Sequence, residues 1–483
     1  MRYSKYKFLP VVISIISFFL CSSIKSQIVS ETIKVENAGT LSTLISQTKK
    51  DSITELNLSG YLNGNDIRYI REMYALTILN MTDVNIVKGG SFSVNGISYS
   101  VIDNTISDYM FCDMPYLNSV TIPNRVTTIG YRSFKHCTGL TSIVIPNRVI
   151  SINESAFEGC TGLTTVTISE KVTSIGASAF KGCTGITAVN IPNSVTSIGS
   201  SAFENCIGLT SIAIPDNVTS IGSNVFSGCT GLKSVIISSK IKIISFGAFE
   251  GCTGLGSVNI PNNIIEIGDY AFKECKGLTT VSIGSSVTSI GGHAFMDCTG
   301  LKSVNIPNST ITIGISAFQN CIGLTSITFG NSVVSLGDLV FWGCPGLKEV
   351  HNSNPTPPSI TSTTFYLVDK LSCYIYVPIN SYSVYKVALG WSDFKNIIEE
   401  GVATSISEIE MNKIQVYTES NAIVVKRANL GETVSVYTLL GTLLQKIKVT
   451  DDEIRIVVPV NNVYLIRVGN KTFKVISQES IVQ

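Results

Sequence analysis

The residues of this 483-residue chain that could carry chemistry are thirteen cysteines, three histidines and a set of evenly spaced glutamates. Cysteines in an exported protein usually form disulfides, and cysteine combined with histidine can bind zinc or supply a nucleophile and its base. The three histidines, His136, His293 and His351, are scattered, and the chain has no HExxH, GxSxG, CxxC or P-loop pattern. We therefore predict no catalytic residue, no cofactor and no metal ligand, and we expect that the protein is not an enzyme.

Ten of the cysteines follow one another at a constant interval of 23 residues, and each lies three positions after a phenylalanine. Their equivalence by translation argues against disulfides, since pairing would pull neighbouring units together two by two. Free cysteine is also among the most buried residue types. We therefore favour a structural ladder of reduced, buried thiols, with disulfides as the alternative. The ladder consists of Cys137, Cys160, Cys183, Cys206, Cys229, Cys252, Cys275, Cys298, Cys321 and Cys344.

The 23-residue unit has a readable internal structure, for example over residues 163–185. Apolar alternation predicts a short strand over 163–168 and a second extended piece over 172–175. Phe180 and Cys183 are three residues apart, so one helical or 3₁₀ turn should aim both side chains inward. Because one such unit cannot bury its apolar side alone, we expect the units to stack into a solenoid with a parallel strand ladder.

Two glycine positions recur in the repeat, one after the second strand and one two places after each cysteine, as at Gly185. Such regularity predicts a backbone position with φ > 0 at Gly185 and its equivalents. After the second strand only Asn153 and Ser245 replace the glycine in the ten cysteine units. Asparagine tolerates the left-handed region, which favours the same interpretation there.

The repeat pattern LxxVxIPxxVTSIGxxAFxxCTG resembles the leucine-rich repeat of the BspA-like class from bacterial surface proteins. The resemblance covers residues 105–350 and implies a leucine-rich repeat solenoid: a parallel strand ladder with short 3₁₀ or helical turns and about eleven repeats. The Asn/Cys column of the commoner leucine-rich pattern is missing, so asparagine-ladder arguments do not transfer. The function that the resemblance implies is adhesion to host matrix, host cells or bacterial partners.

The segments around the repeats predict export and capping. Residues 1–26 have a basic start and a 13-residue apolar run, too short to span a membrane, and are typical of a signal peptide. Lipidation of Cys21 is the alternative. Residues 27–104 are expected to form an N-terminal cap with irregular repeats. Residues 351–402 are expected to form a C-terminal cap that ends the ladder at its prolines, with an aromatic plug of Phe365, Tyr376, Tyr385, Trp391 and Phe394.

Residues 404–483 contain short apolar runs separated by turn residues, which predicts a small all-β sandwich. Their ending, VYLIRVGNKTFKVIS, resembles the C-terminal sorting domain of type IX secretion cargo in the Bacteroidetes. The resemblance implies that this domain engages the secretion machinery and that the protein is secreted or displayed on the outer cell surface. An ordinary accessory sandwich is the alternative.

The surface composition favours binding to another macromolecule. Only 14% of residues are charged and the net charge is +1, so we expect no nucleic-acid partner, and the mature chain should have no transmembrane segment. Outward positions of the first strand form a small polar strip that suits a protein or glycan surface, although most of it could be merely solubilising. The evenly spaced Glu158, Glu204 and Glu250 favour a solvated edge over a calcium site. The alternative function is a structural or assembly component of the cell envelope. The candidate binding residues are Thr141, Thr164, Asn190, Thr210, Lys233, Asn259, Thr279, Lys302, Asn305 and Thr325.

Overall fold

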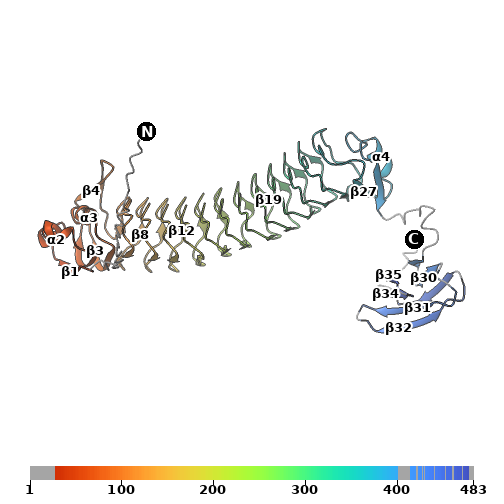
Figure 1. Cartoon of the computed structure of the whole chain (residues 1–483), viewed down its shortest axis with the longest axis horizontal. Coiled ribbons are helices and arrows are strands. Elements are labelled where there is room, and N and C mark those ends of the chain that lie inside the picture. Colours follow the sequence, from red (N-terminus) through yellow and green to blue (C-terminus); the bar gives the residue numbers. More distant parts are fainter. Residues whose placement is uncertain are drawn as a thin grey trace, which may run out of the picture. The chain divides into compact units, whose positions relative to one another are not determined.

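The computed structural model describes residues 28–400 and 414–477, the second range without residues 420–421, 427, 429, 440, 452, 460–461 and 470. The chain divides into two compact units between Glu400 and Gly401 (Figure 1). The expected signal peptide and Cys21 lie outside the described residues. Within those ranges, no helix is long and apolar enough to cross a membrane.

The rungs of the first unit contribute strands to a parallel ladder, and neighbouring strands pair with a shift of 23 residues in the regular repeats (Figure 1). The rung of residues 186–208 contributes only an isolated bridge, between Ala188 and Ser211. This ladder confirms the predicted parallel solenoid. Its strands, in spatial order, are β1 (Ser30–Val35), β2 (Glu55–Leu62), β3 (Ile78–Ile86), β7 (Ser119–Thr121), β9 (Ser142–Val144), β11 (Thr165–Thr167), β14 (Ser211–Ala213), β16 (Ser234–Ile236), β18 (Ser257–Ile260), β20 (Thr280–Ile283), β22 (Ser303–Asn305), β24 (Ser326–Phe329), β26 (Glu349–Asn352), β27 (Tyr374–Pro378) and β28 (Asn396–Glu400).

A second parallel ladder of two-residue strands forms another side of the solenoid. The third side consists of turns, whose backbone is also bonded from rung to rung: Phe157 N donates to Ala179 O at 2.8 Å. The strands of the second ladder are β6 (Thr105–Ile106), β8 (Thr128–Ile129), β10 (Ser151–Ile152), β12 (Ser174–Ile175), β13 (Ser197–Ile198), β15 (Ser220–Ile221), β17 (Ile243–Ile244), β19 (Glu266–Ile267), β21 (Ser289–Ile290), β23 (Thr312–Ile313) and β25 (Ser335–Leu336).

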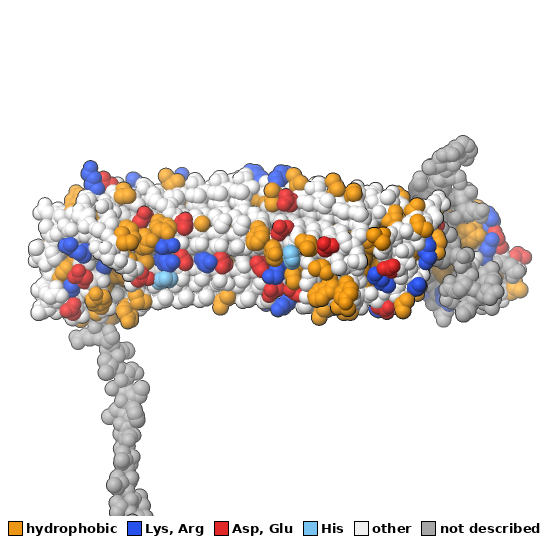
Figure 2. Space-filling view, turned by 90° about the horizontal axis from the view of Figure 1, so that it is seen from above, with side chains coloured by type: hydrophobic (Ala, Val, Ile, Leu, Met, Phe, Trp, Pro, Cys, Tyr) orange, Lys and Arg blue, Asp and Glu red, His pale blue; other side chains and the backbone are white. Residues whose placement is uncertain are grey.

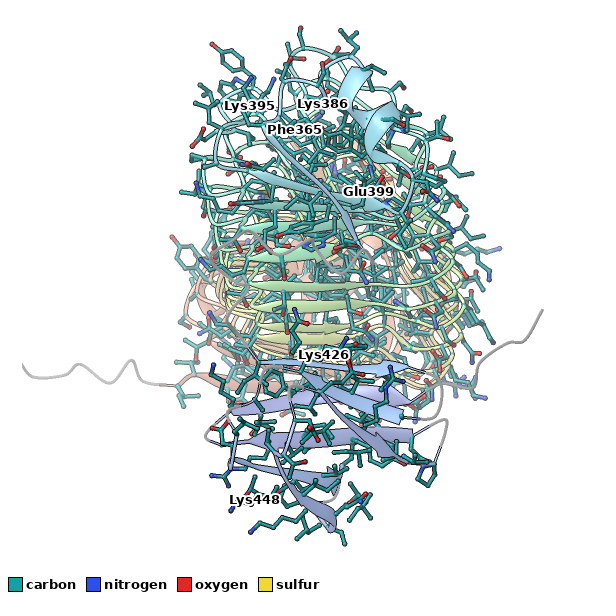
Figure 3. All side chains as sticks on the ribbon, turned by 90° about the vertical axis from the view of Figure 1, so that its right-hand side faces the viewer. Phe365, Lys386, Lys395, Glu399, Lys426 and Lys448 are labelled. Atoms are coloured by element: carbon teal, nitrogen blue, oxygen red, sulfur yellow. The ribbon has the colours of Figure 1, made fainter. Side chains whose placement is uncertain are left out.

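The core is a set of columns that run along the stack. The phenylalanines from Phe111 to Phe341 lie ring on ring, with centroids 5.2–5.8 Å apart, and Phe365 of the cap continues the column. Phe180 and Cys183 are fully buried, as the spacing predicted. Figure 3 views the stack end-on, with Phe365 labelled in the cap. Every rung therefore shares its core with the rungs on both sides, which is why a single unit could not fold alone.

The prediction that Gly185 and its equivalents have φ > 0 is wrong. Positive φ occurs instead one place before the cysteine, as at Gly182 (φ 69°) and Asn205 (φ 59°). At Gly185 an added Cβ would lie 2.8 Å from the carbonyl oxygen of Thr161, one rung away. The glycine after the second strand is also explained by close packing, because a Cβ added at Gly176 would lie 2.6 Å from the backbone of Asn153 in the neighbouring rung. Neither Asn153 nor Ser245, which replace this glycine, has positive φ. Both glycine columns allow rungs to approach closely.

The N-terminal end of the solenoid carries three helices and a hairpin. Helix α3 (Gly64–Arg71) starts with a capping box formed by Asn63 and Asp66. The short helices are α1 (Leu41–Leu44) and α2 (Gln47–Lys50), and the hairpin joins β4 (Ser91–Val94) to β5 (Ile97–Ser100). These elements cover rungs that lack the regular 23-residue pattern.

At the C-terminal end, the first ladder does not stop at the prolines of residues 354–358, as we had expected. They lie in a connection, and β27 and β28 continue the parallel pairing beyond it. Helix α4 (Tyr382–Val387) lies between these two strands in sequence. Of the expected plug, Trp391 and its three aromatic neighbours are buried: Phe365, Tyr385 and Phe394. Tyr376 is the exception, because it lies half-buried on the outer face of β27.

The C-terminal unit has two antiparallel sheets, one of order β29-β30-β33 and one of order β32-β31-β34-β35. Side chains from both sheets, such as Ile423 and Ile466, form one buried cluster, so the unit is a small β-sandwich. Its strands are β29 (Gln415–Glu419), β30 (Ala422–Lys426), β31 (Thr433–Thr438), β32 (Leu443–Lys448), β33 (Glu453–Val457), β34 (Asn462–Val468) and β35 (Lys471–Ser477).

Candidate binding surface on the first strand ladder

The contacts of the cysteine ladder indicate a structural role for its thiols. All twelve cysteines of the described residues are free and buried. Each of the ten ladder thiols donates to the carbonyl oxygen of a phenylalanine 26 residues earlier, at 3.0–3.2 Å, as Cys252 does to Phe226. Burial raises the thiol pKa to about 12 at Cys229 and Cys344, so these groups stay protonated at neutral pH. Cysteine fits this column because it fills a small apolar space and still satisfies a buried carbonyl.

One grouping of cysteine, aspartate and histidine occurs near the N-terminal end. The Cys112 thiol donates to Asp113 Oδ2 at 3.2 Å, and Asp113 Oδ1 lies 2.9 Å from His136 Nδ1. Burial, aided by the Asp113 hydrogen bond, raises the pKa of Cys112 to about 12. The carboxylate stands between thiol and imidazole, so the histidine cannot act directly as the base of the thiol. This order of groups does not make a nucleophile.

The three evenly spaced glutamates belong to a column on the turn side in which opposite charges face each other. Each carboxylate is within 3.0 Å of a lysine ammonium one rung away. In the described parts of the chain, no group of three His, Cys, Asp or Glu residues is placed to hold a metal ion. The pairs are Glu158 with Lys135, Glu204 with Lys181, and Glu250 with Lys273.

The ten candidate binding residues all lie exposed on the outward face of the first ladder or at its edge. The five threonines among them, however, already use their hydroxyl protons within the solenoid. Each donates to the backbone carbonyl of the preceding rung at 3.0–3.3 Å, so it stabilises the ladder and offers a ligand only an acceptor. These threonines are Thr141, Thr164, Thr210, Thr279 and Thr325.

The other five candidates are better placed for binding. The side chains of Asn190, Asn259, Asn305, Lys233 and Lys302 have no hydrogen bond or ion pair with any residue in the described ranges. All five are exposed on the outward face of the ladder or at its edge. Such a row can make an extended contact of several hydrogen bonds with a macromolecule, and it cannot enclose a small ligand.

The same face continues beyond the candidates into β26 and β27, where it becomes aromatic. The rings of His351 and Tyr376 stack with centroids 4.4 Å apart, and Tyr374 lies next to them with 42% of its surface exposed. Glu349 Oε2 lies 3.6 Å from His351 Nε2, and the Glu400 carboxylate contacts His351 Nδ1. We call Glu349, His351, Tyr374, Tyr376 and Glu400 the tyrosine end of the strip.

Sequence reasoning missed the tyrosine end because it assigned Tyr376 to the buried plug. A usable signal was the alternation YIYVP: Ile375 and Val377 are fully buried, so the tyrosines between them must face outward. Tyrosine is one of the residue types that dominate binding energy at protein interfaces. The tyrosine end is therefore the part of the strip best suited to anchor a partner.

Comparisons with known proteins find similar solved structures and two matching family models. Solved structures similar to this chain include a leucine-rich repeat protein from Bacteroides ovatus, 26% identical over 66% of this chain and 80% of that chain, with a TM-score of 0.46. A leucine-rich cell surface protein from Faecalibacterium prausnitzii is 26% identical over 60% of this chain and 90% of that chain, with a TM-score of 0.35. No curated protein sequence matches the chain.

Two family models match. Residues 403–477 match a family described as Domain of unknown function (DUF6383). The family described as BspA type Leucine rich repeat region matches residues 104–233, 173–302, 219–348 and 289–412, which together are more than half of the chain. The protein therefore belongs to the family with the BspA-type leucine-rich repeat region.

Proposed function

We propose that this protein is secreted or displayed on the cell surface and mediates adhesion by binding another protein along the outward strip of its first strand ladder. Leucine-rich repeat proteins of the BspA type generally take part in protein–protein interaction, and they are typically secreted or found at the cell surface. The observation that carries the proposal is the tyrosine end, where the exposed Tyr374 and the half-buried Tyr376 lie on a face that is otherwise small and polar.

The strip and its tyrosine end contribute to binding in different ways. The free asparagines and lysines of the strip supply hydrogen bonds over several rungs, and the aromatic rings at one end supply most of the binding energy. A catalytic role is not part of the proposal, because burial and the Asp113 hydrogen bond raise the pKa of the Cys112 thiol in the cysteine–aspartate–histidine grouping found among the described residues.

A binding assay tests the role of the tyrosine end. Purified protein is passed over immobilised fibronectin, laminin and collagen and is also applied to epithelial and bacterial cells. Tyr374→Ala with Tyr376→Ala should weaken binding at least tenfold. The matched control is Tyr74→Ala with Tyr116→Ala, which removes two exposed tyrosines, 76% and 66% exposed, far along the chain from the strip's aromatic end. Absence of binding to every surface, or equal losses in both variants, would contradict the proposal, and co-purification in a fixed envelope complex would favour an assembly role.

For the C-terminal unit we propose a role as a type IX sorting domain. The support is the sequence resemblance of residues 463–475, which fall in the paired strands β34 and β35. Deleting residues 404–483 in the native bacterium should leave the protein in the periplasm. Delivery of the truncated protein to the outer surface at the normal level would reject this role without affecting the adhesion proposal.

A further inference from the structure

A second surface of different chemistry lies in the turns that connect the first strand of a rung to its second. In three consecutive rungs this turn carries a cation at the same position: Arg125, Arg148 and Lys171. We call these three residues the basic column. All three are exposed, and none forms a salt bridge with a residue that the structure describes. The lysines of the turn-side column, by contrast, are paired with glutamates.

The backbone holds the basic column rigidly. Each cation is followed by a fully buried valine whose N–H donates back into the turn at 3.0–3.1 Å: Val126 to Pro123, Val149 to Pro146, and Val172 to Ser169. Neighbouring rungs of a parallel ladder are about 4.8 Å apart, so the backbone positions of the first and third cation are about 10 Å apart. The three cationic side chains thus start from backbone positions that form a short line along the stack.

An open groove of about 500 Å³ lies between the side chains of Arg148 and Lys171. Its remaining lining consists of Thr127, Asn147, Thr173 and the exposed Ile150, and most of the exposed surface of this lining is apolar. Glu170 is the acidic residue adjacent to the column in sequence. The next two rungs carry Ser194 and Asn217 at the column position, so the line of positive charge ends after Lys171.

We propose that the basic column and its groove bind a linear sulfated glycan. A row of cations matches sulfate groups repeated along a polymer. The Asn147 amide can donate to sugar hydroxyls, and the hydroxyls of Thr127 and Thr173, which donate to Asn104 O and Ile150 O, can accept from them. A single-stranded nucleic acid fits less well, because the groove has no aromatic side chain on which a base could stack. A membrane surface fits less well, because insertion needs a broad apolar face and Ile150 is the one large apolar side chain in the lining of the groove.

The test measures binding of the full purified chain to immobilised heparin at several salt concentrations. The variant Arg125→Gln, Arg148→Gln, Lys171→Gln should bind at least tenfold more weakly, and its plot of log Kd against log salt should be shallower by about 2. The matched control Lys276→Gln, Lys386→Gln, Lys395→Gln removes the same charge from exposed residues that do not form a line, and should change binding less than twofold.

Further variants and ligands separate this site from non-specific charge attraction. Arg125→Lys with Arg148→Lys keeps the line of charge and should retain binding within about threefold, and circular dichroism melts check that every variant folds. Equal losses in the triple variant and its control would overturn the proposal. Binding of polyglutamate, single-stranded DNA or anionic phospholipid vesicles as tightly as heparin would also overturn it. Because the tyrosine end lies on another face, its variants should bind heparin normally.

Discussion

A methyl group added at Gly300 should force two rungs of the solenoid apart. Gly300 lies two places after Cys298, and its Cβ would lie 2.6 Å from the carbonyl oxygen of Lys276 and 3.0 Å from that of Leu278. Both oxygens belong to the backbone of the preceding rung, so no side-chain rotation relieves the contact. The rungs are tied on either side of this point, for example by Glu274 N donating to Met296 O at 2.8 Å.

The cost follows from these contacts. Overpacking a tightly packed site costs about 1–3 kcal/mol, and loosening one inter-rung hydrogen bond adds about 0.5–1.5 kcal/mol. We therefore expect Gly300→Ala to lower the free energy of local opening by about 2–4 kcal/mol. The control is Gly256→Ala: an added Cβ there has no atom within 4 Å, and the lower entropy of the unfolded chain should make it neutral or stabilising by up to about 1 kcal/mol.

Amide hydrogen exchange is the suitable assay, because long repeat arrays can open locally and do not unfold as one cooperative unit. The loss predicted for Gly300→Ala corresponds to exchange about 30-fold faster or more at the amides of the two rungs. Exchange in Gly300→Ala equal to that in Gly256→Ala would refute the steric reasoning. Recovery of stability in Gly300→Asn would instead indicate a left-handed backbone at this position, since asparagine tolerates that conformation.

Three further predictions concern the cysteine thiols, the carboxylate of Glu158 and the C-terminal cap of the solenoid. Thiol titration of the denatured, unreduced protein should find all twelve described cysteines reactive, and a count below four would contradict a reduced ladder. Burial raises the pKa of Glu158, but hydrogen bonds from Ser155 and Lys135 outweigh it and hold that pKa below its ordinary value. Its stabilising contribution is therefore present above about pH 4.3 and lost as pH falls through the folded-state pKa, so Glu158→Gln should flatten that part of the curve of local opening free energy against pH, measured by amide hydrogen exchange. Trp391→Phe removes the hydrogen bond from the indole N–H to Pro358 O (2.8 Å) and should lower the free energy of local opening of the cap, measured by amide hydrogen exchange, by about 1–3 kcal/mol. A similar loss in half-buried Trp342→Phe would contradict this reason.

The columns of the solenoid could be predicted from the sequence because one spacing governs them all. Once Phe180 and Cys183 recur every 23 residues, only stacking places each such pair in the same environment. The reason for the glycines could not be predicted, because a left-handed φ and a close approach of backbones select the same residue. Deciding between them requires the distance from Gly185 to the neighbouring rung.

The candidate surface was predictable in its location and less so in its chemistry. Alternation along the strand shows that Thr164 faces outward, but its free hydrogen-bonding capacity depends on a carbonyl of Thr141, a whole rung away. Tyr376 was misplaced for the opposite reason: aromatic composition was given more weight than the alternation with Ile375 and Val377.

The strict 23-residue register of the ladders has a consequence for how this protein can change over generations. Each regular rung makes its backbone bonds to the same positions of the rung before and the rung after, as Ser151 pairs with both Thr128 and Ser174. An in-frame recombination event that duplicates or deletes one whole unit would join two surfaces that already fit each other. The number of rungs, and with it the reach of the exposed strip, can therefore vary by gene rearrangement without any new packing solution.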